Sequence, residues 1–397
     1  MTNNFKIYFL LGILGLWSLG CGNLFQSDTD LRERVKREPV IEKKSSNASV
    51  DDKTNQEDAD KLNSDLEGNE NSEESTDEVN QKLDPQKNTE NVDPQDLDET
   101  ESSPENKQDD KNSEEMQVEP PSSFLDPGVL PTQWNHGTDP CSADQNPEIQ
   151  VHEYNSNFFI LRQNKCRNFE APFMYLIFGK EKVLLHDTGA LRNSELLTLV
   201  NATIDKWKLD NNIANISLLI THSHGHGDHI AGDSLFADRV ETELVAANVT
   251  ALSNFFNITN WPEQVVNFDL GDRVLDLIPI PGHQEAHIAL YDRKTGVLLT
   301  GDTLYPGRLY INDWAVYGNS ISRLYEFMKL QKTSYVMGAH IEMSSTPGQD
   351  YPIRTTFQPR EHLLELKLET LKELDDALKL IGNTPKREVH NSFIISP

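Results

Sequence analysis

The chain contains 397 residues, of which 64 are Asp or Glu and 36 are Lys or Arg. The formal net charge of -28 leaves no basic excess to attract a phosphate backbone, so we expect no nucleic acid among its partners. The charge is uneven, because residues 51–120 hold 25 acidic against 6 basic side chains. Composition thus separates an acidic segment from a remainder that can form one or two domains.

The N-terminus has the pattern of a targeting signal. Lys6 precedes an apolar run over residues 7–19, which is shorter than the roughly 20 residues that span a bilayer. Gly20 and Cys21 follow directly, and a small residue before cysteine at the end of such a run resembles a bacterial lipoprotein signal. The resemblance implies a signal peptide over residues 1–20, a lipid on Cys21, and a protein anchored outside the cytoplasm to a bacterial membrane. An ordinary signal peptide, an uncleaved anchor and a chance apolar start are the alternatives.

Residues 21–125 are predicted to form a disordered acidic linker. No aromatic residue lies between Phe25 and Phe124, and Asp, Glu, Asn, Gln and Ser are abundant. Such a segment cannot bury enough apolar surface to offset the entropy lost on ordering. We expect it to hold a folded domain away from the membrane, with a specific acidic interaction tail as the alternative.

Two cysteines, Cys141 and Cys166, lie near the start of the remaining chain. Export would place them under oxidising conditions, in which a disulfide persists. Closing this loop would stabilise the fold by about 3 to 4 kcal/mol. Two buried free thiols are the alternative, and neither cysteine has the spacing of a zinc-binding pair.

Residues 130–397 are predicted to form one α/β domain. Short apolar runs bounded by Gly, Pro and Asn predict strands over residues 158–161, 173–178, 183–186, 216–220, 265–268, 273–280, 286–291, 297–300 and 335–338. Amphipathic patterns predict helices over residues 193–208, 320–331 and 361–380. This order indicates two packed sheets with helices on their outer faces.

A dense histidine cluster follows the predicted strand 216–220. His224 and His226 flank one glycine, so in an extended loop both imidazoles can reach the same ion. Asp228 and His229 come next and could approach a second ion. Imidazole and carboxylate without thiolate suit zinc, iron or manganese, and they indicate an open catalytic site.

Four side chains from one loop cannot complete two coordination shells, so other segments must contribute. Three residues of metal-binding type lie near glycine at the ends of predicted strands: His283 in a P-G-H motif, Asp302 in a G-D-T motif and His340 in a G-A-H motif. We expect these three side chains to join the cluster.

The H-x-H-x-D-H run followed by P-G-H, G-D-T and G-x-H resembles the metallo-β-lactamase fold superfamily, and most closely its glyoxalase II-like hydrolases. The resemblance implies an αββα sandwich and two divalent ions, zinc before iron or manganese. It also implies a bridging hydroxide as nucleophile, with Asp228 and Asp302 as catalytic carboxylates. The implied ligands are His224, His226 and His283 for one ion and Asp228, His229 and His340 for the other, with Asp302 bridging.

Other polar residues near these motifs are assigned supporting roles. Asp187 lies in an H-D-T-G segment that also resembles the superfamily. It is expected to contact a metal-binding side chain without binding the metal itself, as are His222 and His287. Tyr305 and Arg308 are candidates for binding a substrate, with Arg308 suited to a carboxylate or phosphate. The alternative for both is packing within their own loop.

We therefore expect a metal-dependent hydrolase of a small-molecule ester, thioester, lactone or phosphoester. The residues after 301–303 lack the glycine-rich stretch that leads to glutathione-binding residues, which argues against glutathione thioesters. A mononuclear iron enzyme resembling persulfide dioxygenases and a β-lactam hydrolase are the alternatives. Metal content separates the first alternative from a two-metal hydrolase.

Overall fold

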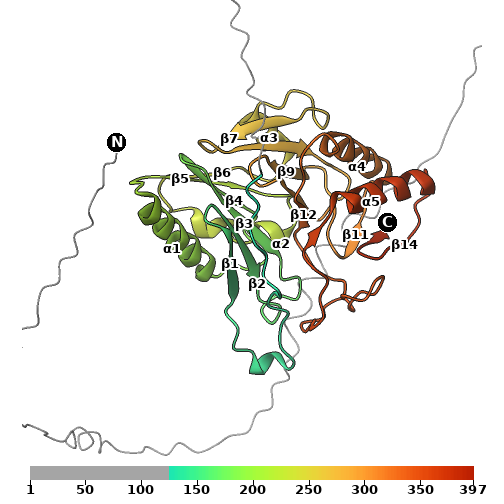
Figure 1. Cartoon of the computed structure of the whole chain (residues 1–397), viewed down its shortest axis with the longest axis horizontal. Helices are drawn as coiled ribbons and strands as arrows, with labels where there is room; N and C mark the ends of the chain where they lie inside the picture. Colours follow the sequence, from blue (N-terminus) through green and yellow to red (C-terminus); the bar gives the residue numbers. More distant parts are fainter. Residues whose placement is uncertain (1–124) are drawn as a thin grey trace, which may run out of the picture. The chain divides into compact units, whose positions relative to one another are not determined.

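The computed structural model describes residues 125–397, which contain two six-stranded mixed sheets (Figure 1). The first sheet contains β1 (Ile149–Asn155), β2 (Phe158–Gln163), β3 (Phe173–Phe178), β4 (Lys182–His186), β5 (Ser217–Thr221) and β6 (Thr242–Leu244), in that order. The second contains β7 (Val266–Asp269), β8 (Val274–Pro279), β9 (Ile288–Asp292), β10 (Val297–Gly301), β12 (Tyr335–Gly338) and β13 (Glu365–Leu366). Its strand order is β13-β12-β10-β9-β8-β7, in which β10 and β12 pair in parallel.

Helices and a small sheet complete the domain. The helices are α1 (Ser194–Asn211), α2 (Gly227–Ile230), α3 (Val249–Phe256), α4 (Trp314–Met328) and α5 (Leu368–Ile381), with short 3-10 turns at Cys141–Ala143 and Asp233–Phe236. The small sheet joins β11 (Arg308–Tyr310), β15 (Ile394–Ser396) and β14 (Glu388–Val389).

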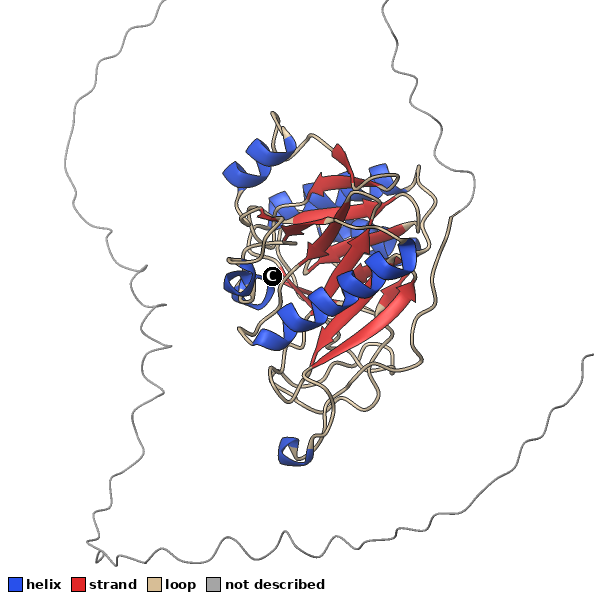
Figure 2. Cartoon of the chain, turned by 90° about the vertical axis from the view of Figure 1, so that its left-hand side faces the viewer, coloured by secondary structure: helices blue, strands red, loops and turns tan. Residues whose placement is uncertain are grey.

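Three apolar layers hold the sheets and helices together. Between the sheets, side chains such as Phe158 and Tyr175 pack with Leu277 and Leu290 of the facing sheet. Helix α1 covers the outer face of the first sheet, and α4 and α5 cover that of the second. Figure 2 shows helices in front of and behind the strands. The predicted αββα sandwich is therefore the observed fold.

Two predicted helices begin at other positions. Helix α4 begins at Trp314 rather than 320, because the Asp313 side chain accepts a hydrogen bond from the Val316 amide and caps an earlier first turn. The prediction that a helix begins at residue 361 was wrong. Glu361 instead forms a buried ion pair with Arg162, and β13 adds to the second sheet before α5 begins.

Several earlier predictions lie outside the described residues. These are the signal peptide over 1–20, the lipid on Cys21 and the acidic linker up to residue 124. Among the helices of residues 125–397, none has the length and apolar character needed to cross a bilayer.

Candidate metal centre

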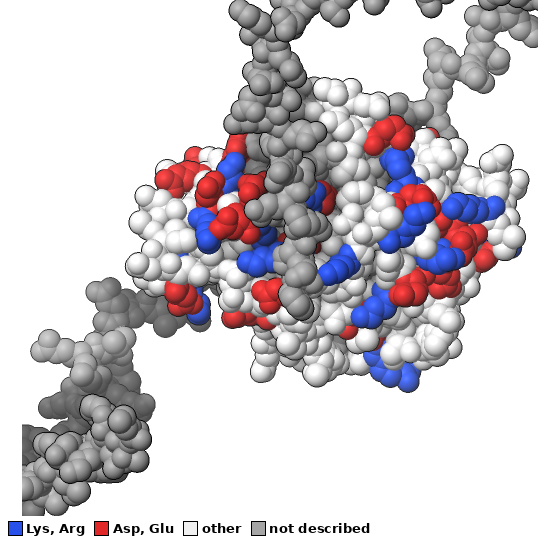
Figure 3. Space-filling model, turned by 45° about the horizontal axis from the view of Figure 1, so that its top comes forward, with Lys and Arg blue, Asp and Glu red and all other residues white. Residues whose placement is uncertain are grey.

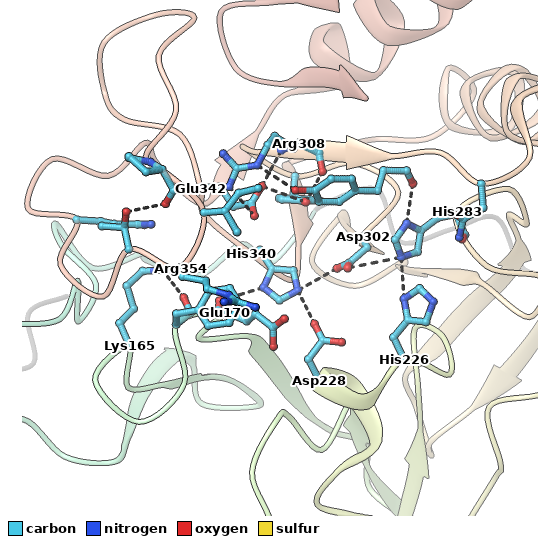
Figure 4. Close-up of a pocket in the computed structure, with 18 residues that line it drawn as sticks. Lys165, Glu170, His226, Asp228, His283, Asp302, Arg308, His340, Glu342 and Arg354 are labelled. Carbon is cyan, nitrogen blue, oxygen red and sulfur yellow. Dashed lines mark hydrogen bonds and ion pairs between the residues drawn. The ribbon is translucent and has the colours of Figure 1, made fainter. Parts of the chain in front are cut away.

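The ligand candidates lie where strands of both sheets end. Strand β5 leads into the loop with His224 and His226, and α2 then carries Asp228 and His229. From the second sheet, β8 leads to His283, β10 to Asp302 and β12 to His340. Five of these seven side chains line the floor of one pocket, which Figure 4 shows in close-up, and His224 and His229 are buried next to them.

Glycine permits the strand ends to approach this closely. Gly282 has φ of 134°, and a Cβ there would lie 2.4 Å from the Cα of Tyr317. Gly301 has φ of 50°, and its Cβ would lie 2.5 Å from the Cβ of Ser223. Both positions favour glycine because of backbone conformation and close packing. The glycines of the P-G-H and G-D-T motifs thus set the positions of the adjacent ligands.

The first group of ligands, here called the three-histidine cluster, consists of His224, His226 and His283. The His226 Nδ1 atom lies 2.9 Å from His224 Nε2 and 3.1 Å from His283 Nε2, and the two Nε2 atoms are 3.2 Å apart. Burial lowers the pKa of His224 well below its usual range and also lowers that of His226. Neutral imidazoles are the protonation state that binds metal.

The second group, here called the mixed cluster, consists of Asp228, His229, Asp302 and His340. Asp228 Oδ2 is 3.2 Å from the Nε2 atoms of both His229 and His340. Burial opposes protonation of His229, but Asp302 and Asp228 raise its pKa well above the usual range. Burial also opposes protonation of His340, and Asp302 again raises the pKa. The carboxylates therefore favour positive charge at the centre of this cluster.

Asp302 lies between the two clusters. Its Oδ2 atom faces the three-histidine cluster, 3.7 Å from His283 Nε2 and 3.9 Å from His224 Nε2. Its Oδ1 atom faces the mixed cluster, 3.2 Å from His340 Nε2 and 3.4 Å from His229 Nε2. One carboxylate can thus serve both clusters at once.

The proton positions on the histidines fit a metal in each cluster. His283 Nδ1 contacts the carbonyl of Tyr310 at 2.7 Å, and a carbonyl only accepts, so Nε2 presents a lone pair inward. By the same argument, the Glu170 carbonyl at 3.1 Å from His340 Nδ1 turns the His340 Nε2 lone pair toward two carboxylates. At His340 such facing lone pairs repel one another unless a proton or a metal cation lies between them, in keeping with its raised pKa.

Two buried atoms without a hydrogen-bond partner also indicate that a metal fits these clusters. His229 Nε2 and Asp302 Oδ1 are buried and have no hydrogen-bond partner within residues 125–397. Buried polar atoms usually have a partner, and an ion is one explanation when they lack it. The donor set of five imidazoles and two carboxylates suits zinc.

Residues behind the clusters orient the ligands. The Asp187 carboxylate lies 3.0 Å from His229 Nδ1 and accepts the Ser223 amide hydrogen bond at 2.7 Å. His287 accepts a hydrogen bond from the backbone amide of Asp302 at 3.2 Å and stacks on the His224 ring. Partners of this kind fix ring orientation and tautomer.

His222 has a different environment from the other histidines of its run. Its Nε2 lies 2.8 Å from Asp233 Oδ1, and Asp233 also accepts a hydrogen bond from the Thr188 hydroxyl. The ring therefore connects the loop to the segment after α2 and belongs to neither cluster.

The pocket has a volume of about 420 Å³ and extends well beyond the clusters. Tyr305 and Arg308 line it, as the sequence suggested, but the Tyr305 hydroxyl donates to the Arg308 carbonyl. The Arg308 guanidinium pairs with Glu342 at 3.1 Å and Asp350 at 2.6 Å. The donors of Arg308 are thus used within the protein.

Sequence reasoning missed several charged residues of this pocket, among them Lys165, Glu170 and Arg354. Lys165 and Glu170 belong to a loop after β2 that the disulfide Cys141–Cys166 ties to an adjacent loop. Arg354 lies between β12 and β13. None of the three is in a motif, so the sequence carried no signal for them beyond the cysteine pair.

Comparisons with known proteins agree with this geometry. A family model described as the metallo-beta-lactamase superfamily matches residues 167–340. The acyl-coenzyme A thioesterase MBLAC2 of Homo sapiens is 26% identical over 174 residues, which cover 36% of this chain and 61% of that protein. A hydroxyacylglutathione hydrolase of Cyanothece sp. is 28% identical over 167 residues, which cover 35% of this chain and 63% of that protein. The chain thus spans about three fifths of the length of these curated relatives.

The chain is also similar to a solved structure. The metallo-beta-lactamase from Pontibacter korlensis is 18% identical, with a TM-score of 0.40, and the match covers 58% of this chain and 99% of that chain.

Proposed function

Since residues 167–340 form a domain of the metallo-β-lactamase superfamily, we propose that the protein is a metal-dependent hydrolase of thioesters. One observation carries the proposal: seven ligand-type side chains converge as two clusters at one pocket, with Asp302 facing both. A single-metal site would not need the second cluster. Because no serine or cysteine is among the described residues that line the pocket, we expect metal ligands rather than a serine or cysteine nucleophile to drive the reaction.

The residues divide the chemistry between them. The three-histidine cluster would hold one ion and the mixed cluster a second, with Asp302 between them. Bound divalent ions supply Lewis acidity, which polarises a substrate carbonyl and favours ionisation of water near neutral pH. Asp187, Ser223 and His287 hold the ligands in place through the hydrogen bonds described above. The pocket beyond the clusters then positions the remainder of the substrate.

The thioester is chosen from the hydrolyses expected of this fold because of the relatives. The human relative is named an acyl-coenzyme A thioesterase and the cyanobacterial one a hydroxyacylglutathione hydrolase. A panel of matched acetyl thioesters, oxygen esters, a lactone and a phosphodiester tests the choice. We expect the zinc-loaded protein to release thiol from the thioesters fastest; faster cleavage of another class would reassign the substrate.

Replacing Asp302 tests the two-cluster mechanism. Asp302→Ala removes the one carboxylate that faces both clusters, so we expect thioester hydrolysis to fall by more than the roughly 100-fold that loss of an outer partner costs. Asp238→Ala, at an exposed position outside both clusters, is the matched control. Kinetics and a thermal melt of each variant are measured; retained activity in the Asp302 variant would refute the mechanism.

We further propose that the enzyme acts outside the cytoplasm, attached to the membrane through a lipid on Cys21. The apolar run before Cys21 and the pairing of Cys141 with Cys166 support this location. Cys21→Ala should release the protein from a membrane fraction, and unchanged fractionation would count against the anchor. On the face in Figure 3, basic side chains are mixed with acidic ones, in keeping with a small-molecule substrate rather than nucleic acid.

A further inference from the structure

The pocket contains a wall that the proposed hydrolysis leaves without a role. Besides Arg308 and Glu342, which pair with each other, its charged members are Lys165 and Glu170, from the loop after β2, and Arg354, from the segment between β12 and β13. In Figure 4 Lys165 and Arg354 lie on one side of His340, while His226 and His283 lie on the other. A volume of about 420 Å³ is in the range that accommodates a whole small ligand, so a substrate can reach both sides.

Arg354 is held at this wall in a conformation that glycine favours. The Thr355 amide donates to the Pro352 carbonyl at 3.1 Å and closes a four-residue turn in which Arg354 is third. Its φ is 69°, and positive φ at the third position of a turn favours glycine or asparagine.

The Arg354 guanidinium is also unpaired. It forms no hydrogen bond or ion pair with any of residues 125–397, although it lines the pocket. Arg308, the other arginine of the pocket, has its donors occupied by Glu342, Asp350 and Tyr310. Arg354 is thus an exposed residue with free donors, whereas Arg308 uses most of its donors within the protein.

Lys165 is a buried cation with incomplete compensation. Its side chain is 1% exposed, and Nζ donates to the Phe169 carbonyl at 3.1 Å. The nearest carboxylate, Glu361, is 3.8 Å away and binds Arg162 through both oxygens at 2.6 and 2.7 Å. Burial lowers the Lys165 pKa to about 7, so an added anion would stabilise its charged form.

The loop that presents Lys165 is anchored on both sides of it. Cys166 forms the disulfide with Cys141, and the Asn164 side chain donates to Asp144 at 2.6 Å. The cation therefore keeps its place at the wall without a ligand, which reduces the cost of ordering when a ligand binds.

We propose that Lys165 and Arg354 form an anion subsite that binds a carboxylate or phosphate on the thiol carrier of the substrate. The inference rests on the proposed thioester hydrolysis and names its substrate class: thioesters of acidic thiols. The acyl carbonyl lies at the clusters, and the acidic group of the carrier lies at the wall. Both cations are specificity residues and take no part in bond cleavage.

Two matched substrate pairs test the subsite with the zinc-loaded full chain. S-acetyl-4′-phosphopantetheine and S-acetylpantetheine differ by one phosphate, and S-acetyl-3-mercaptopropionate differs from its primary amide by one carboxylate. We expect kcat/KM to favour the anionic member of at least one pair by about tenfold or more, mainly through KM, since a charged hydrogen bond contributes that much. The pair with the larger preference identifies the anion.

Variants then locate the preference. Arg354→Gly removes the guanidinium and leaves a residue suited to φ of 69°, so folding is retained; Lys165→Met removes the buried charge. We expect each to lose about tenfold of the preference for the anion while hydrolysis of the neutral member stays within about twofold. Arg360→Gln is the control, because Arg360 is exposed on the same segment and outside this pocket. Equal loss for both members of a pair would overturn the subsite.

Binding without turnover separates the two proposals. Calorimetry with the corresponding S-methyl thioethers, which cannot be hydrolysed, measures the preference for the anion directly. If binding favours the anion and no thioester is hydrolysed, the proposed function fails and the subsite stands. If thioesters are hydrolysed but neither thioether pair shows a preference that Arg354→Gly removes, the subsite fails and the proposed function stands.

Discussion

The floor and the wall of the pocket are held in place by different means. The metal ligands at the floor follow strands β5, β8, β10 and β12, and partners such as Asp187 and His287 fix their positions. The wall residues Lys165 and Arg354 belong to irregular segments, which depend on a disulfide and on the buried pair Arg162–Glu361. Sheets give the ligands the fixed geometry that metal binding requires, whereas loops can vary with the substrate at little cost to the fold.

Breaking the buried ion pair should have the largest effect, and it should affect the wall alone. Glu361→Gln leaves the Arg162 guanidinium, whose side chain is 0% exposed, without a charged partner in its bidentate contact. We expect the free energy of unfolding to fall by about 3 to 5 kcal/mol. Urea denaturation measures the loss.

Metal content is the companion measurement for that variant. We expect Glu361→Gln to bind as much zinc as the unchanged protein, because the strand ends that carry the ligands are intact. Arg360→Gln, at an exposed site nearby, should leave both stability and zinc content unchanged. Loss of zinc with Glu361 would mean that floor and wall are not independent.

A smaller effect, on the floor alone, is expected from Asp187→Asn. Asparagine tolerates the Asp187 φ of 70°, but it lacks the charge that holds His229 Nδ1 at 3.0 Å. We expect metal affinity and turnover to fall by roughly 10- to 100-fold. Competition with a zinc chelator measures the metal affinity. Since the wall is unchanged, the preference for an anionic substrate should persist. Loss of this preference would show that the floor and the wall are not independent.

A pH dependence is also expected at the wall. Lys165 faces Arg162, Glu361, Glu342 and Arg308, and burial lowers its pKa to about 7 in the folded protein, against 10.5 for an ordinary lysine. Between these values the unfolded chain binds a proton that the folded protein has released, so the free energy of unfolding rises with pH. Lys165→Met should remove this part of the rise. Denaturation at several pH values from 6.5 to 10 checks it, and an unchanged slope would refute the assignment.

The floor could be predicted from the sequence because short motifs follow buried strands. In P-G-H and G-D-T, glycine permits the close approach and places His283 and Asp302 directly at the sheet edge. Ligand type, strand and glycine are all local properties, so they are readable without the fold.

The wall could not be predicted in the same way. Lys165 and Arg354 come from segments without periodicity, and only tertiary packing brings them to one pocket. Arg308 appeared from sequence to be free for a ligand, because its partners Glu342 and Asp350 arrive from a later segment. Glu361 matched a helical pattern, but its pairing with Arg162, 199 residues away, prevails over local propensity.

The central claim is that both clusters hold metal together and hydrolyse a thioester. The most direct test is elemental analysis of the purified full chain after zinc loading and removal of free metal, run beside the thioester assay. The account predicts about two zinc ions per chain, with fewer in Asp302→Ala and no hydrolysis by that variant. One iron per chain, with oxygen uptake on a persulfide and no thioester cleavage, would contradict it.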